Sequence, residues 1–178
     1  MQGMPAPDRH AKRHPSVTAL LDAHPSQSDP KVIIRNLARE KVAYAKSKGW
    51  SGPPYCPKEF ASIFGIRCKE VTHDIGGDGR ILMGPDGRLL IEFASGKVIE
   101  RQRFTMFHEF AHTLFPDYCA FVAQHNQSRE ASASEDFEFE SLCDVAAAEM
   151  LFPLEDFNED LSRLPQACFE TIHDLRSR

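Results

Sequence analysis

The stretch 103-RFTMFHEFAHTLF-115 sets two histidines and a glutamate, His108, Glu109 and His112, in an otherwise apolar run. Such a run predicts a helix that is buried along most of its length. Buried polar groups cost free energy unless they are paired or bind a metal. The segment is therefore either a helix with a harmless solvated face or a helix whose polar residues hold an ion.

The spacing of the three residues favours the ion. His108 and His112 are four residues apart, so both rings leave one face of a helix about one turn apart. Both can then reach one ion at the ~2.0–2.1 Å of zinc–nitrogen bonds. Glu109 lies about 100° around the helix from His108. It can hold a water bound to the ion and act as a general base.

A third ligand is expected downstream, and three patterns can supply it. The metzincin pattern fails, because its Gly and His positions hold Phe115 and Tyr118. Asp117 is near, but it follows a helix-ending proline. In "ESLCD" (140–144), Glu140 and Asp144 share one helical face. This is the gluzincin arrangement, in which the Glu binds the metal and the Asp accepts the free N–H of a ligand histidine. We take Glu140 as the third ligand.

Other interpretations of these polar residues stay open. Glu149 competes with Glu140, but nine residues further on it faces roughly the opposite side of the helix. Glu140 and its neighbours can also form a plain acidic surface. His125 is a further possible ligand in a polar loop. Hydrolases with such a metal site usually add a Tyr or His that stabilises the oxyanion formed when water attacks a carbonyl group. The sequence does not identify this residue, and the candidates are Tyr118, His125 and His173.

The composition suits an ordinary globular domain. The 178 residues are 42% hydrophobic and 26% charged, with a net charge of -5 and no dense block of Lys and Arg. This argues against direct nucleic-acid binding, which needs clustered cations. Five cysteines without a CxxC pair argue against disulfides and a cysteine zinc site. No signal sequence or membrane-length apolar run is visible, so the expected location is the cytoplasm, without membrane attachment.

The order of patterns predicts an α+β domain. We expect a flexible N-terminal tail over residues 1–28 and a single domain over 29–178. Within it, helices come first, then a small antiparallel sheet, then the HExxH helix packed on a Glu-bearing helix. The stretch "RLLIEF" (88–93) is our candidate for a sheet edge that holds a substrate segment. The expected elements are helices at 29–48 and 57–64, strands from 80 around turns at "GPDG" and "SGK", a helix at 102–115, a loop at 116–136, a helix from 137 to 152, and surface helices beyond it.

Two segments resemble a known family. "RQRFTMFHEFAHTLF" (101–115) and "FESLCDVAAAEMLFP" (139–153) are similar to the ImmA/IrrE family of bacterial metallopeptidases. That family shows an R-x-R-F-T lead-in, an HExxH helix and an E-x-x-x-N/D-x-x-A-A-E-x-L-x-P helix, and the resemblance covers about residues 29–154. It implies a zincin-like minimal metalloprotease domain. It also implies the metal ligands His108, His112 and Glu140, the catalytic base Glu109, and Asp144 as the partner of a ligand histidine.

The resemblance also implies a function. Such proteins are typically cytoplasmic proteases that cut helix-turn-helix repressors of the Xre type, which relieves repression of stress or mobile-element genes. Zinc is the expected metal, although Mn²⁺ or Fe²⁺ would accept the same ligands. The alternative is a non-catalytic partner or sensor, an antitoxin-like binding protein on a zincin fold. The intact HExxH favours the enzyme, because a pure binder has no need of Glu109. A small-molecule metallohydrolase is a third, weaker hypothesis.

Overall fold

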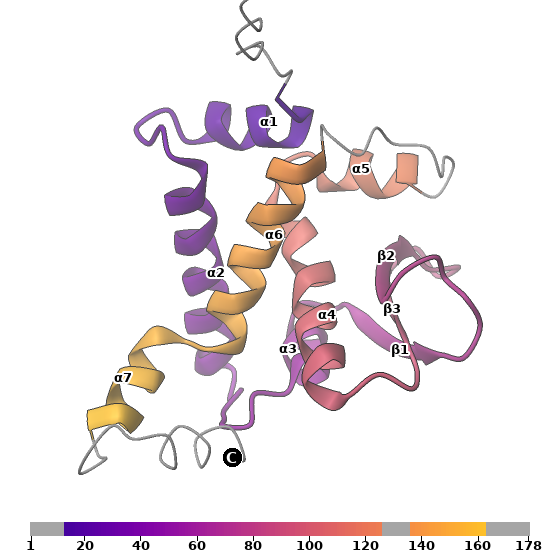
Figure 1. Cartoon of the computed structure of the whole chain (residues 1–178). Helices are drawn as coiled ribbons and strands as arrows, with labels where there is room; N and C mark the ends of the chain where they lie inside the picture. The colour runs from indigo at the N-terminus through magenta and orange to yellow at the C-terminus, as the bar shows by residue number, and fades with distance from the viewer. Residues whose placement is uncertain (1–12, 126–135, 163–178) are drawn as a thin grey trace, which may run out of the picture.

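The computed structural model of the chain describes residues 13–125 and 136–162. Figure 1 shows the arrangement of its helices and strands. The elements are α1 (Pro15–Ala23), α2 (Pro30–Ser47), α3 (Pro57–Ile63), β1 (Arg67–Val71), β2 (Gly79–Met83), β3 (Leu89–Ala94), α4 (Ile99–Ala111), a 3-10 turn η1 (His112–Leu114), α5 (Tyr118–His125), α6 (Asp136–Leu151) and α7 (Leu154–Ser162).

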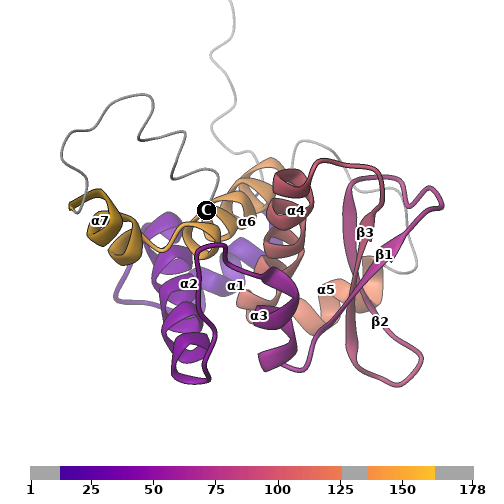
Figure 2. The same cartoon turned by 90° about the horizontal axis from the view of Figure 1, so that it is seen from below.

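The body of the molecule is a row of three helices beside a small sheet. Helix α6 packs against α2 on one side and α4 on the other, and α4 also contacts β2 and β3. Figures 1 and 2 show the same order of α2, α6, α4 and sheet from two directions, with α7 at the end away from the sheet. The α+β, zincin-like class expected from the sequence is confirmed, and the HExxH helix packs on the Glu-bearing helix.

The close approach of α4 and α6 has a cause in the sequence of α6. The middle of this helix carries small side chains at Cys143, Ala146 and Ala147, and all three are fully buried. Small residues let two helix axes come close, because little side-chain volume separates the backbones. Helix α6 is therefore able to lie between two neighbours at once.

The sheet is mixed rather than antiparallel. The predicted hairpin is confirmed, since β2 and β3 pair antiparallel around the turn after Met83. Strand β1, which the sequence analysis did not predict, adds parallel to β3. The strand order is therefore β1-β3-β2. Strand β3 is central, so the prediction of residues 88–93 as a sheet edge is wrong, and the edges are β1 and β2.

Local signals set the ends of several helices. Asp29 caps α2, since its side chain accepts a hydrogen bond from the Lys31 N–H at 2.9 Å. Gly65 ends the α3 turn with a φ of +74°, a conformation that glycine adopts without strain. Helix α4 begins at Ile99, three residues before the prediction, because the turn after β3 is short. Its α-helical part ends at Ala111, and the 3-10 turn then carries His112.

Two segments are more ordered than the sequence indicates. Within the predicted tail of residues 1–28, residues 15–23 form α1, and Val17 and Leu20 are fully buried. The apolar patch there is short, but it has a partner in the rest of the fold. Helix α5 likewise lies in the stretch predicted as a loop, where Val122 is buried.

Two further observations concern membranes and cysteines. In residues 13–125 and 136–162, no helix has the length and apolar character needed to cross a bilayer. The cysteines in the same ranges, Cys56, Cys68, Cys119 and Cys143, are free thiols.

An aromatic cluster joins the helices behind the sheet. Phe60 is fully buried, and its ring centroid lies 4.9 Å from those of Trp50 and Phe110 and 5.4 Å from that of Phe107. Phe60 therefore connects α3 to the core face of α4, the helix that carries the HExxH motif.

We predict that Phe60→Ala lowers the free energy of unfolding by about 3–5 kcal/mol, because it leaves a cavity among packed rings. Urea denaturation followed by circular dichroism measures the change. The matched control is Phe137→Ala, since Phe137 is 76% exposed and should be almost neutral. Equal effects from the two variants would show that Phe60 does not anchor the core.

Candidate metal centre

Three predicted ligands come together where α4 meets α6. His108, near the end of α4, His112, at the start of η1, and Glu140, on α6, each offer one ligand atom, and these atoms all lie within 4.8 Å of one another. His108 Nε2 is 2.9 Å from Glu140 Oε2. Among the residues that the structure describes, this is the one group of its kind. The chain can therefore hold a metal ion at this point.

The donor set fits a divalent cation. Ligand atoms that share one tetrahedral zinc lie roughly 3.4 Å apart, so the three side chains need only small adjustments. The rings are also oriented for binding through Nε2. His108 Nδ1 is 2.8 Å from Asp144 Oδ1, and His112 Nδ1 is 3.5 Å from Cys143 Sγ. The carboxylate of Asp144 favours a proton on Nδ1 of His108, and both rings direct Nε2 towards the acidic side chains of the site, His108 to Glu140 and His112 to Glu109.

Asp144 lies where the sequence analysis expects it, next to a ligand histidine on the α4 side of α6. Cys143 was not expected to contact the site. Its position could have been found from helical spacing, because Cys143 is three residues after Glu140 and therefore lies on nearly the same face of α6. The two histidines thus have different partners, a carboxylate for His108 and a thiol for His112.

Glu109 lies beside this group without belonging to it. Its side chain is 11% exposed, and its Oε2 is 3.8 Å from His112 Nε2. The carboxylate also accepts a hydrogen bond from the backbone N–H of Ile81 in β2. This contact with the sheet was not predicted, because sequence patterns do not show which strand lies along α4. Glu109 therefore faces the space near the ligands from the sheet side.

The charges of these groups influence one another. Burial would lower the pKa of His108, but the hydrogen bond to Glu140 and the neighbouring carboxylates of Glu109 and Asp144 outweigh it and raise the pKa to about 9. Burial raises the pKa of Glu109 to about 7, against the opposing effect of His108 and with a further rise from Glu140. A carboxyl group with a pKa near neutrality is suited to accepting and returning a proton.

The remaining predicted candidates lie elsewhere or outside the described side chains. Glu149 faces α2, where its Oε1 accepts a hydrogen bond from Arg39 Nε at 2.7 Å. Tyr118 begins α5, and its hydroxyl hydrogen-bonds with Cys119 rather than with a ligand. The side chain of His125 and the whole of His173 are outside the part of the chain that the structure describes. No oxyanion-stabilising group is therefore assigned.

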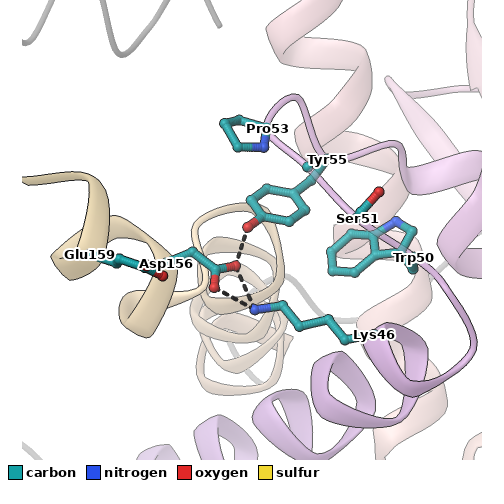
Figure 3. A pocket seen from close by; sticks show the side chains of 8 residues that line it. Lys46, Trp50, Ser51, Pro53, Tyr55, Asp156 and Glu159 are labelled. Atoms are coloured by element: carbon teal, nitrogen blue, oxygen red, sulfur yellow. Dashed lines mark hydrogen bonds and ion pairs between the residues drawn. The ribbon is translucent and has the colours of Figure 1, made fainter. Parts of the chain in front are cut away.

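A cavity of about 400 Å³ lies at the other end of the molecule, beside α7. Figure 3 shows Asp156 of α7 between Lys46 and Tyr55, with its carboxylate in contact with both. Lys46 Nζ is 2.6 Å from Asp156 Oδ1. The contact of Asp156 with Lys46 fastens α7 to α2. The cavity is therefore separate from the metal centre.

Comparison with known proteins identifies the region that holds the site. Residues 88–168 match the model of the family Peptidase_M78, described as IrrE N-terminal-like domain. The matched region runs from just before β3 past α7, and so contains the three ligands and Glu109. No curated protein matches the chain.

We predict that Glu140→Ala greatly reduces the metal content of the purified protein, because one of three ligands is lost. The control is Glu149→Ala, which removes a carboxylate from the α2 side of the same helix and should leave the metal content unchanged. Elemental analysis of the two folded variants gives the answer. Metal loss from the Glu149 variant alone would reverse the ligand assignment.

Metal binding should also depend on pH. His108 carries a proton below about pH 9, and an incoming ion must displace it. We therefore expect the affinity for Zn²⁺ to rise about tenfold per pH unit as the pH increases towards that value. Competition with a chelator of known proton affinity measures the zinc affinity at each pH. In Asp144→Asn, which removes one of the charges that raise this pKa, the dependence should end at a lower pH. An affinity that is independent of pH would contradict this account.

Proposed function

We propose that the chain, whose residues 88–168 match the model of the IrrE N-terminal-like peptidase family, is a zinc-dependent endopeptidase of the ImmA/IrrE type. In this proposal His108, His112 and Glu140 hold the zinc, and Glu109 is the general base. Asp144 positions His108. The observation that carries the proposal is the meeting of three ligand atoms from α4, η1 and α6 within 4.8 Å, with Glu109 beside them.

The roles of the residues follow from their surroundings. When bound, zinc supplies a Lewis acid that polarises a carbonyl group and makes a water molecule more acidic. Glu109 is placed to take a proton from the attacking water and to deliver it to the leaving amine. Its burial and its hydrogen bond from Ile81 hold one orientation of the carboxylate. His108 and Glu140 are more open, with side chains 18% and 44% exposed, so a substrate approaches from their side.

The proposed substrate is a helix-turn-helix transcriptional repressor of the Xre type. The support for this substrate is the resemblance of the two motifs to the family. The net charge of -5 and the lack of a dense block of Lys and Arg in the sequence argue against direct binding to DNA, and so favour action on a DNA-binding protein instead. Cleavage in the cytoplasm would relieve repression of stress or mobile-element genes. The reduced cysteines of the described residues are compatible with that compartment.

We predict that Glu109→Gln abolishes peptide cleavage while the protein keeps its metal, because the amide cannot accept the proton of the water. Cleavage assays and elemental analysis on the same preparation separate these two effects. The control is Glu59→Gln, which makes the same change in the first turn of α3 and should leave cleavage intact. A Glu109 variant that cuts at nearly the wild-type rate would remove Glu109 from the mechanism.

The substrate class is tested by incubating the zinc-loaded protein with purified Xre-type repressors. Mass spectrometry should then show one discrete cut that a chelator prevents and added zinc restores. A stable complex without any cut would instead support the non-catalytic partner. Turnover of small amides or esters without cleavage of any protein would point to a small-molecule hydrolase.

A further inference from the structure

Strand β2 is an edge of the sheet and packs against α4. In an antiparallel pair, alternate residues direct their N–H and C=O groups to the partner strand, and the others point away. Here the Ala94 N–H donates to the Asp78 carbonyl at 2.8 Å, and the Gly84 N–H donates to the Arg88 carbonyl at 2.7 Å. In the register of β2 and β3, the even-numbered residues of β2 therefore bond to β3. The odd-numbered residues, Gly79, Ile81 and Met83, direct their backbone groups outward.

One of these outward groups is already used. The Ile81 N–H donates to the carboxylate of Glu109. The side chain of Glu109 is almost fully buried, so this bond forms where water has little access. A backbone N–H in a sheet has a fixed direction, whereas a glutamate side chain on a helix has several rotamers. The strand therefore fixes the orientation of the carboxylate.

The contact requires β2 to lie very close to α4, and Gly79 makes this possible. A Cβ atom added to Gly79 would lie 2.4 Å from Thr105 Cγ2 and 3.1 Å from both Cγ and Oε1 of Glu109. The first distance is far shorter than any normal contact between carbon atoms. A side chain at this position must therefore displace the side chains of Thr105 and Glu109 or move β2 away from α4, and either shift alters the contact between Glu109 and the Ile81 N–H.

We propose that Gly79 is a positioning residue for Glu109: its lack of a side chain lets β2 approach α4 so that the Ile81 N–H holds the catalytic carboxylate. The effect on cleavage rests on the proposed peptidase function. The effect on the hydrogen bond rests on the structure alone. Strand β2 lies outside the region 88–168 that matches the family model. The contact between β2 and Glu109 that Gly79 allows is therefore not part of the two motifs.

The first test is kinetic and uses three variants. Gly79→Ala should bind zinc normally and lower kcat on the order of tenfold to a hundredfold with little change in KM, because a displaced carboxylate impairs the chemical step. Thr105→Ser removes the Cγ2 atom that the new methyl group would meet, so Gly79→Ala/Thr105→Ser should recover most of the lost activity. Thr105→Ser alone should cut at close to the wild-type rate.

Gly77→Ala is the matched control for the loss of a glycine. An added Cβ at Gly77 meets only the Gly79 carbonyl, at an ordinary distance of 3.8 Å. This variant should be as active as wild type. The proposal is overturned if folded Gly79→Ala cuts as fast as Gly77→Ala. It is also overturned if the double variant Gly79→Ala/Thr105→Ser is no more active than Gly79→Ala.

The second test does not depend on cleavage. Amide hydrogen exchange followed by NMR reports the Ile81 N–H directly, and this N–H should be protected in the wild type although it lies on a sheet edge. Exchange should be on the order of tenfold faster or more in Glu109→Ala and in Gly79→Ala, and unchanged in Gly77→Ala. If wild type cuts no peptide but Ile81 behaves in this way, the proposed function fails and the positioning contact stands. Unchanged protection of Ile81 in Glu109→Ala overturns the contact itself.

Discussion

The close packing of α4 against α6 is the constraint on which the site depends. Neither helix carries a complete donor set, since two ligand atoms come from the end of α4 and η1 and the third from α6. A metal needs its ligands placed within a few tenths of an ångström, which side-chain rotation can supply only when the two backbones are already close. The buried small residues Cys143, Ala146 and Ala147 provide this closeness. A larger side chain there would separate the motifs, although each motif would remain intact.

Residues of α6 contact both histidines of the HExxH motif. Asp144 and Cys143 are consecutive residues of α6, and each contacts the Nδ1 atom of a different histidine of the HExxH motif. Helix α6 therefore contributes one ligand and orients the two others. A carboxylate makes an imidazole more basic than a neutral thiol does, so the two histidines differ as ligands. This inequality is a property of the α4–α6 contact and not of HExxH alone.

The site could be predicted from sequence to the extent that it is helical. His108 and His112, and likewise Glu140 and Asp144, are related by helical spacing, which needs no knowledge of the fold. The choice of Glu140 over Glu149 followed from the same geometry, and the structure turns these two residues towards different neighbouring helices.

The sheet was harder to predict, because the parallel pairing of β1 with β3 joins segments about twenty residues apart and leaves no local pattern. The burial of Val17 and Leu20 in α1 likewise depends on distant partners. Gly79 did carry a signal, since a glycine inside a strand often marks a close approach of backbone, but the sequence could not name what approaches.

The metal and the base thus depend on different parts of the fold. The ligands are set by two helices, whose relative position the small residues of α6 determine. The proposed base, Glu109, is oriented by strand β2, through a hydrogen bond that depends on Gly79 having no side chain. Metal binding tolerates some movement of the sheet, because the sheet contributes no ligand. Proton transfer does not tolerate such movement, because its rate falls steeply once the carboxylate is no longer aligned with the reacting atoms. In this proposal the HExxH and ExxxD motifs together specify a metal site, whereas efficient catalysis further requires an edge strand that neither motif contains.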